Sequence, residues 1–159
     1  MAAIINMTSD FLEVLLLATL PFTELRLALP LALTVYNLPP ASAYIAAVIG
    51  NILPVIVIIK ILPWFVSTFR EKISLLDKFF TWWFNRVNST YESKMKKWGT
   101  LALLIFVAIP LPMTGAWTGS VAAYLFNIPQ KKAFIYILLG VMIAGIVILS
   151  GTLGIIKLF

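Results

Sequence analysis

Three stretches without any charged residue constrain this chain more than any other feature of its sequence. They cover residues 27–59, 98–130 and 133–156, and each is longer than the roughly 20 apolar residues that cross a lipid bilayer. Hydrophobic residues make up 62% of the chain, charged residues only 11%, and the mean hydropathy is +1.03, which is far more apolar than a soluble domain. The sequence therefore predicts an all-α integral membrane protein, one membrane domain over residues 1–159, and excludes a soluble globular enzyme.

Cysteine and histidine are both absent from the chain. The protein therefore has no thiol nucleophile, no disulfide, no imidazole general base and none of the usual zinc ligands. We expect no catalytic residues, no metal site and no cofactor, so the protein is not expected to be an enzyme.

Basic residues are concentrated in one segment. Eight of the twelve Lys and Arg residues lie between residues 60 and 97. Positive charge of this kind marks the cytoplasmic side of a membrane protein, beside anionic headgroups, whereas a nucleic-acid-binding protein has a broader basic face. We expect a multi-pass protein of the cell (plasma) membrane, with this connector cytoplasmic, the lipid bilayer as its partner and no nucleic acid bound.

Comparison of the chain with itself at an offset of 90 residues reveals a repeat. Residues 36–39 (Tyr-Asn-Leu-Pro) align with residues 126–129 (Phe-Asn-Ile-Pro), and Gly50 aligns with Gly140. In each repeat an apolar arm, residues 11–20 or 100–109, ends at a proline cluster before a second apolar arm begins. Ten helical residues span about 15 Å, half of a roughly 30 Å hydrocarbon core. This pattern predicts a re-entrant helical hairpin in each repeat, and one long kinked spanning helix is the alternative.

Charge placement distinguishes these two topologies. If one true span follows each hairpin, at residues 41–62 and 133–155, then Lys131 and Lys132 lie on the same side as the basic connector, as the positive-inside rule requires. Kinked spans would place both lysines outside. The sequence therefore favours an inverted repeat of two re-entrant hairpins, each followed by a transmembrane helix, with both termini outside. Repeat 1 covers about residues 9–63 and repeat 2 about residues 98–157. The connector, about residues 64–97, is predicted to contain an amphipathic interfacial helix.

The first hairpin tip carries the charged residues that are most unusual for a membrane segment. Residues 21–26 read Pro-Phe-Thr-Glu-Leu-Arg, and an ionisable residue inside a membrane is a candidate functional residue. Thr23 is predicted to cap the returning helix, whose N-terminus favours anions, and Arg26 offers a planar fork suited to phosphate or carboxylate. Glu24 is a candidate proton carrier. A Glu24–Arg26 pair that only fixes the tip is the alternative.

The second tip has no charge but is rich in hydroxyls and small residues. Residues 110–120 read Pro-Leu-Pro-Met-Thr-Gly-Ala-Trp-Thr-Gly-Ser. Thr114 is predicted to be an N-cap and Trp117 could line an acyl tail, whereas Gly115 and Gly119 could serve only close helix packing. Asn51 is the other polar residue expected to be buried; it could hydrogen-bond a tip, coordinate a cation or join helices. The candidate site thus comprises hairpin-tip prolines, substrate-binding residues and supporting polar residues: Pro21, Pro30, Pro110 and Pro112; Thr23, Glu24, Arg26, Thr114, Gly115, Trp117 and Thr118; Asn51 and Ser120.

These motifs resemble those of the small multi-drug export protein family. The resemblance rests on residues 21–26 with Pro30, on Gly50 and Asn51, and on residues 107–120 (Val-Ala-Ile-Pro-Leu-Pro-Met-Thr-Gly-Ala-Trp-Thr-Gly-Ser). That family is similar to the wider DedA superfamily, which implies two opposed re-entrant hairpins and translocation of a lipid phosphate such as undecaprenyl phosphate. DedA proteins place an arginine in their second hairpin as well, whereas this chain has no basic residue between Lys97 and Lys131.

Three functions are compatible with these residues. The first is a transporter or flippase that moves a small anion or lipid phosphate, with Arg26 holding the anion and Glu24 coupling its movement to a proton. The second is proton-coupled export of lipophilic cations, with Glu24 as counter-ion and Trp117 in cation–π contact. The third is a membrane scaffold that transports nothing. A homodimer is plausible for so small a protomer.

The predicted topology can be tested on a chain that naturally lacks cysteine. Single cysteines introduced at Asn37, Asn88 and Gln130 should react with a membrane-impermeant maleimide from the outside only at position 37. The other two should react only after the membrane is opened, because both are predicted to be cytoplasmic. Labelling of position 130 from the outside would instead indicate kinked spans.

Overall fold

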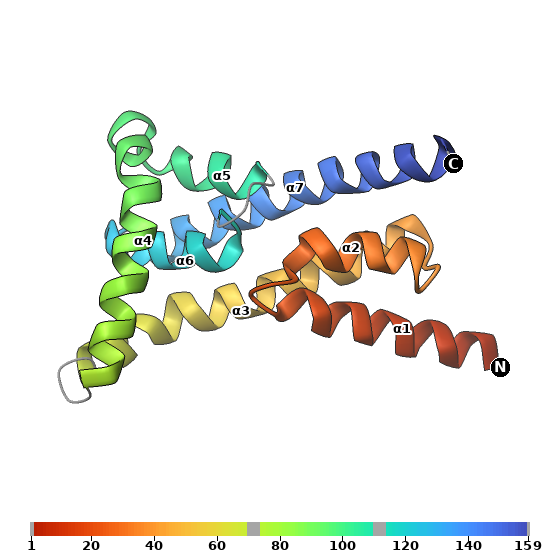
Figure 1. The fold of residues 1–159 in the computed structure, drawn as a ribbon, viewed down its shortest axis with the longest axis horizontal. Helices are drawn as coiled ribbons and strands as arrows, with labels where there is room; N and C mark the ends of the chain where they lie inside the picture. The colour runs from red at the N-terminus through yellow and green to blue at the C-terminus, as the bar shows by residue number, and fades with distance from the viewer. Residues whose placement is uncertain (1, 70–73, 110–113, 159) are drawn as a thin grey trace. The chain divides into compact units, whose positions relative to one another are not determined.

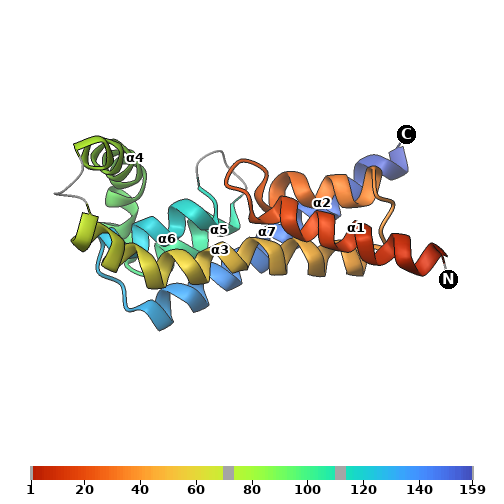
Figure 2. The ribbon, with the colours of Figure 1, turned by 90° about the horizontal axis from the view of Figure 1, so that it is seen from below.

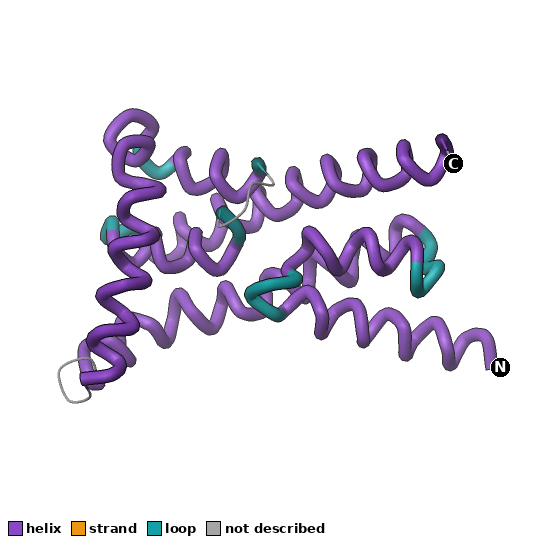
Figure 3. The backbone as a smooth tube through the Cα atoms, in the orientation of Figure 1, coloured by secondary structure: helices purple, strands orange, loops and turns teal. Residues whose placement is uncertain are grey.

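The computed structural model describes residues 2–69, 74–109 and 114–158, and over these ranges the chain is helical, with no strand. The breaks between the helices are short (Figure 1, Figure 3). The helices within the described ranges are, in chain order, α1 (Ala2–Thr19), α2 (Glu24–Thr34), α3 (Pro40–Phe69), α4 (Ser74–Trp98), α5 (Leu101–Ala108), α6 (Ala116–Leu125) and α7 (Gln130–Leu158).

Helices α3 and α7 are the long elements of the fold. They contain 30 and 29 residues, and the segments Pro40–Thr68 and Gln130–Leu158 are long and apolar enough to cross a bilayer. At 1.5 Å per residue each helix is about 45 Å long. The spans predicted at residues 41–62 and 133–155 lie within them, so the prediction of two long apolar helices is confirmed.

The chain divides into two compact units: unit 1 combines the two ends of the sequence, and unit 2 is the continuous segment between them. Unit 1 comprises Met1–Pro54 and Val141–Phe159, and unit 2 comprises Val55–Gly140. Both divisions fall inside the long helices α3 and α7. Each unit therefore contains one pair of shorter consecutive helices, α1 with α2 or α5 with α6, together with part of α3 and part of α7.

In unit 1 the helices α1 and α2 form a hairpin, with α2 running back along α1 (Figure 1, Figure 2). Gly50 of α3 lies directly against the last turns of α1. A Cβ atom at Gly50 would collide with the carbonyl oxygen of Leu15 and lie 2.8 Å from the Cβ of Ala18. The missing side chain therefore allows the backbones of α1 and α3 to pack closely.

A second glycine joins α3 to α7 within unit 1. A Cβ atom at Gly145 would lie 2.7 Å from the Tyr44 ring and 3.3 Å from a methyl group of Leu25. The Tyr44 hydroxyl donates a hydrogen bond to the carbonyl oxygen of Met142, at 2.9 Å. Leu25 is almost fully buried, so α2, α3 and α7 meet at this point.

Unit 2 uses glycine in the same way. A Cβ atom at Gly140 of α7 would lie 2.7 Å from the Cβ of Val107 and 3.0 Å from the carbonyl oxygen of Leu104, both in α5. Gly119 of α6 approaches a methyl group of Val107 from another side, at 2.9 Å from the position of its absent Cβ. Val107 is thus enclosed by two glycines, and α5, α6 and α7 pack closely around it.

Helix α4 is amphipathic, as predicted for the connector. It packs on α5 and α6. Its Phe80, Phe84 and Val87 are buried, while Asn85 and Arg86 are exposed. The Phe84 ring lies 5.8 Å from that of Tyr124 of α6, centroid to centroid. The helix covers Ser74–Trp98, so one regular element joins residue 74 to the start of the second helix pair.

Two asparagines shape the turns before the long helices. Asn37 and Asn127 have φ angles of 50° and 51°, in the left-handed region that asparagine tolerates better than most residues. In each turn the N–H of the following residue donates to a carbonyl oxygen in the preceding helix at 2.9 Å. In both turns the next helix begins three residues after the asparagine, at Pro40 or Gln130.

The first arm is longer than predicted. Residues 11–20 were expected to form it, whereas α1 begins at Ala2 and ends at Thr19. Nothing in residues 2–10 stops a helix, since neither proline nor glycine occurs before Pro21. At 18 residues α1 is about 27 Å long, whereas α5, with eight residues, is about 12 Å long.

Substitution of Gly50 by Ala should destabilise the protein by about 1–3 kcal/mol, because the added methyl group meets backbone atoms of α1 that cannot move independently. Thermal unfolding in detergent micelles measures this change. Gly151 is the matched control: it lies in α7 with no atom within 4 Å of its Cβ position, so Gly151→Ala should be neutral or stabilising by up to about 1 kcal/mol. Equal effects of the two substitutions would contradict the close approach of α1 and α3.

Candidate functional site

The first hairpin tip turns through a strained glutamate. The amide of Glu24 donates to the carbonyl oxygen of Leu20, at 3.0 Å, and Glu24 has a φ angle of 44°. A bulky residue in this left-handed region costs about 1–3 kcal/mol and is typical of functional sites. Glu24 is also buried, with 7% of its surface exposed, whereas the neighbouring Phe22 is 92% exposed. The backbone turn therefore directs the carboxyl group into the protein.

Arg26 lies beside this buried carboxylate. Its Nε atom is 4.0 Å from Oε2 of Glu24, and the two side chains are 22% and 9% exposed, respectively. Residues two apart on a regular helix do not face each other, but the left-handed φ of Glu24 breaks the regular geometry at the start of α2. The pair reduces the cost of burying each charge, and part of the Arg26 side chain remains accessible.

The hydroxyls of both tip threonines bond to the preceding helix, and Thr23 does not cap α2 with its side chain, contrary to the prediction. Thr23 precedes α2 with helical rather than extended dihedral angles and makes no side-chain capping bond; its hydroxyl donates instead to the Leu17 carbonyl oxygen. The Thr114 hydroxyl donates to the Ile109 carbonyl oxygen at 3.1 Å, and the N-cap of α6 is Gly115. Both hydroxyls thus serve the last turn of the preceding helix, whose carbonyl groups lack helical donors.

The second tip is buried and close-packed. Thr118 donates to the Gly115 carbonyl oxygen at 3.0 Å, and Ser120 donates to that of Ala116 at 2.7 Å. Gly115 and Ser120 are buried and Trp117 is half-buried. Pro110 and Pro112 lie outside the described residues. These side chains belong to unit 2, whereas Thr23, Glu24 and Arg26 belong to unit 1.

Three other predicted residues lie in unit 1. Asn51 is in α3 and is 3% exposed, and its Oδ1 atom meets no hydrogen-bond donor among the described residues. Pro21 is exposed in the turn between α1 and α2. Pro30 is half-buried inside α2, where it has no N–H to offer the carbonyl group four residues earlier.

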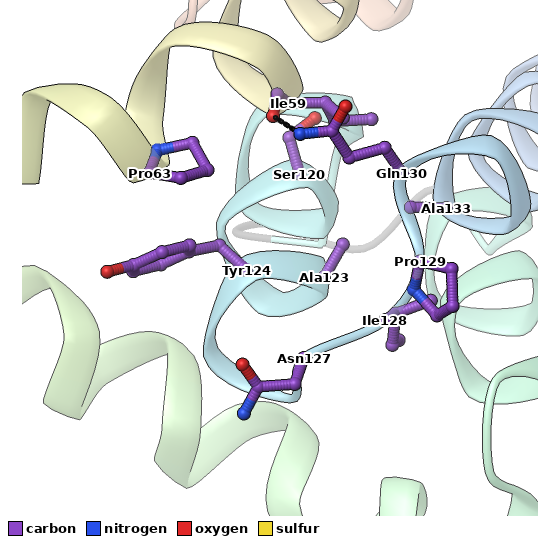
Figure 4. A pocket seen from close by; sticks show the side chains of 10 residues that line it. All are labelled: Ile59, Pro63, Ser120, Ala123, Tyr124, Asn127, Ile128, Pro129, Gln130 and Ala133. Atoms are coloured by element: carbon purple, nitrogen blue, oxygen red, sulfur yellow. Dashed lines mark hydrogen bonds between the residues drawn. The ribbon is translucent and has the colours of Figure 1, made fainter.

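A pocket in unit 2 contains residues that the sequence did not single out. It has a volume of about 270 Å³ and is lined by residues of α3, of α6 and of the turn into α7 (Figure 4). Its polar side chains are those of Ser120, Tyr124, Asn127 and Gln130. Only Ser120 was predicted to support a site. The other three come together only because the turn at Asn127 brings α7 back beside α6.

Gln130 makes the most informative contact in this pocket. Its Nε2 donates to the carbonyl oxygen of Ile59 in α3, at 3.2 Å (Figure 4). In an unbroken helix that oxygen would accept from the N–H of residue 63, but residue 63 is proline and has no N–H. Gln130 therefore replaces the missing donor. Pro63 signals in the sequence that such a donor is needed, but not which residue supplies it.

The described residues contain no group of three or more His, Cys, Asp or Glu side chains that could hold a metal ion. The polar groups of the tips are one acid, one arginine, hydroxyls and backbone amides. This chemistry can bind an anion and carry a proton.

A family model described as "Putative small multi-drug export protein" matches residues 24–147, from the start of α2 to within α7. The chain belongs to this family. Neither a curated protein nor a solved structure matches the chain. Membership of the small multi-drug export family, together with the apolar helices, points to a membrane protein that exports rather than to an enzyme.

Substitution of Gln130 by Leu should lower the free energy of unfolding by about 1–3 kcal/mol, because the Ile59 carbonyl group loses its donor. Pro63→Ala restores an N–H within α3. We therefore expect Pro63→Ala to stabilise the Gln130→Leu variant more than it stabilises the wild type, as measured by a double-mutant cycle of thermal unfolding. Strict additivity of the two substitutions would show that Gln130 is not the substitute donor.

Proposed function

We propose that this member of the small multi-drug export family moves an anionic substrate across the membrane, either a small anion or a lipid phosphate such as undecaprenyl phosphate. Arg26 would hold the anionic group and Glu24 would carry a coupled proton. The observation that supports this proposal is the pair itself: a buried carboxylate lies 4.0 Å from an arginine that stays partly accessible. Charged groups inside a membrane segment are costly and usually functional.

The coupling follows from competition for one guanidinium group. While Glu24 is ionised it interacts with Arg26, and an anionic substrate must compete with it. Protonation removes the charge of Glu24, so Glu24 no longer neutralises the charge of Arg26, and the attraction of Arg26 for an anionic substrate increases. Anion binding should therefore be stronger while Glu24 is protonated than while it is ionised.

The second tip carries the other proposed substrate-binding residues. At the start of α6 the N–H groups of the first residues lack helical acceptors, and a helix N-terminus attracts anions. Gly115 would permit close approach of a ligand, and the hydroxyls of Thr114 and Thr118, which donate to backbone carbonyl oxygens, would turn toward it. Trp117 would contact an apolar tail. Thr23 and Ser120, whose hydroxyls bond to the backbone, would hold the two tips in shape, with Asn51 as a further polar group.

The arrangement that we propose around this site is an inverted repeat of two re-entrant hairpins in the plasma membrane. Its support is the recurrence of three backbone features at an offset of 90 residues: the close-packed glycines Gly50 and Gly140, the left-handed asparagines Asn37 and Asn127, and equal 2.9 Å hydrogen bonds at the start of α3 and α7. The proposed topology keeps the basic connector cytoplasmic and both termini outside.

Proton-coupled export of lipophilic cations is the second candidate, and the family description favours it. In that case Glu24 would be the counter-ion of the substrate, and Trp117 would supply cation–π contact. Arg26 opposes this function, because its charge repels a cation from the same carboxylate. The position of Arg26 beside Glu24 is the reason that we place the anion first.

Thermal stabilisation by ligands distinguishes the two candidates, since a ligand that binds only the folded protein raises its melting temperature. We expect an alkyl phosphate to stabilise the purified protein and an alkyl trimethylammonium of equal chain length to have no such effect. Arg26→Ala should weaken phosphate binding by about 10- to 100-fold, the loss of a charge-assisted hydrogen bond. Glu24→Gln should preserve binding but abolish its pH dependence and the response of transport to a pH gradient in proteoliposomes.

Arg86→Ala is the matched control, because Arg86 is exposed on α4, and it should leave phosphate binding unchanged. Undiminished phosphate binding in Arg26→Ala would overturn the site. Stabilisation by the ammonium compound that increases in Arg26→Ala would favour cation export.

A further inference from the structure

Asn51 places an oxygen without a donor in the middle of α3. The residue is 3% exposed, and Oδ1 has no hydrogen-bond partner among the described residues. A buried amide oxygen without a partner costs about 1–3 kcal/mol, and in folded proteins such a group usually indicates a bound water, an ion or a functional role. The proposed function uses Asn51 only as a further polar group near the tips, and it names no partner for this oxygen.

The carbonyl group of the preceding residue also lacks its helical donor. In an unbroken helix the Gly50 carbonyl oxygen would accept from the N–H of residue 54, and residue 54 is proline. Pro54 therefore removes the helical donor of the Gly50 carbonyl oxygen, just as Pro63 removes that of the Ile59 carbonyl oxygen. Gln130 supplies the replacement donor for Ile59, whereas no side-chain hydrogen bond to Gly50 is found in the described part of the chain.

The same turn of α3 is closed by α1. Gly50 has no side chain, and the carbonyl oxygen of Leu15 lies so close to the position of its absent Cβ that a Cβ atom would collide with it. Gly50 and Asn51 are both buried. Two consecutive residues therefore carry oxygen atoms that need another partner: Asn51 Oδ1 has none, and the Gly50 carbonyl oxygen lacks its regular helical donor. Both lie in a buried turn that a third carbonyl oxygen approaches.

We propose that Asn51 Oδ1 and the Gly50 carbonyl oxygen bind Na⁺. Neutral carbonyl oxygens can replace the hydration shell of an alkali cation, and carbonyl groups freed from helices are used for this purpose in transporters. The described residues hold no acidic cluster, so a divalent cation, which prefers carboxylates, fits less well. The Na⁺ site involves neither Glu24 nor Arg26 and does not depend on the identity of the transported substrate.

The test is the melting temperature of the purified full-length chain in NaCl and in choline chloride at equal ionic strength and without substrate. We expect a saturable rise with Na⁺ on the order of 5 °C. Asn51→Leu should abolish this rise. Pro54→Ala returns an N–H to the Gly50 carbonyl oxygen, so it should raise the Na⁺ concentration at half-effect by about tenfold or more, the loss of one ligand.

Pro63→Ala is the matched control for Pro54→Ala, because it also changes a proline of α3. The carbonyl oxygen that lacks a donor because of Pro63 is that of Ile59, and it already accepts a hydrogen bond from the Gln130 amide. Pro63→Ala should leave the Na⁺ concentration at half-effect unchanged. Asn51→Asp keeps the oxygen and adds a negative charge, so it should lower the Na⁺ concentration at half-effect. This variant tests the proposal even if Asn51→Leu fails to fold. A melting temperature that is the same in NaCl and choline chloride would overturn the proposal and assign the oxygen to a buried water. A shift that persists in Asn51→Leu would overturn it as well.

Discussion

Backbone N–H and C=O groups must be hydrogen-bonded where water is scarce, and this requirement underlies much of the structure. Helices satisfy it with regular bonds between residues four apart, and proline interrupts that pattern. Pro54 and Pro63 interrupt the ladder of α3 without ending the helix, so the carbonyl groups of Gly50 and Ile59 must find other partners. At Ile59 the partner is the amide of Gln130, 71 residues along the chain. At Gly50 we infer that the partner of the carbonyl oxygen is a Na⁺ ion. One local rule thus accounts for a tertiary contact and for a candidate site.

Close packing around glycine provides much of the remaining support. Apolar helices gain little from hydrophobic association in lipid, so they depend on close approach of backbones. Gly50 against α1 and Gly140 against α5 supply this approach in the two units. Gly50 packs α3 against α1, and Gly140 packs α7 against α5. The second helix of each pair, α2 or α6, follows after a turn. The hairpin tips are therefore held by packing next to the turns that carry their polar residues.

The charged pair at the first tip combines strain with partial neutralisation. Glu24 adopts a left-handed conformation that glycine would adopt at lower cost, and it buries a carboxylate next to Arg26. Such a pair adds little net stability, because the desolvation of two charges offsets their attraction. The presence of an acid in a backbone conformation that suits glycine therefore supports the roles in binding and proton transfer that we propose for it. Membership of an export family is consistent with this interpretation.

Local features of the sequence determined the membrane class, the two long helices and the amphipathic connector. They also determined the helix breaks near Pro21 and before Thr114. Hydropathy, charge and proline have these effects because each acts on the segment that contains it. The motif containing Glu24 and Arg26 was also evident, since charge is rare in apolar segments. The tertiary structure alone decided the rest. The threonine hydroxyls bond to the preceding helix because of the dihedral angles at the turns, Arg26 meets Glu24 because one φ angle is positive, and Gln130 meets Ile59 because α7 returns beside α3. Each of these depends on backbone geometry or on neighbours distant in sequence, which residue patterns do not encode.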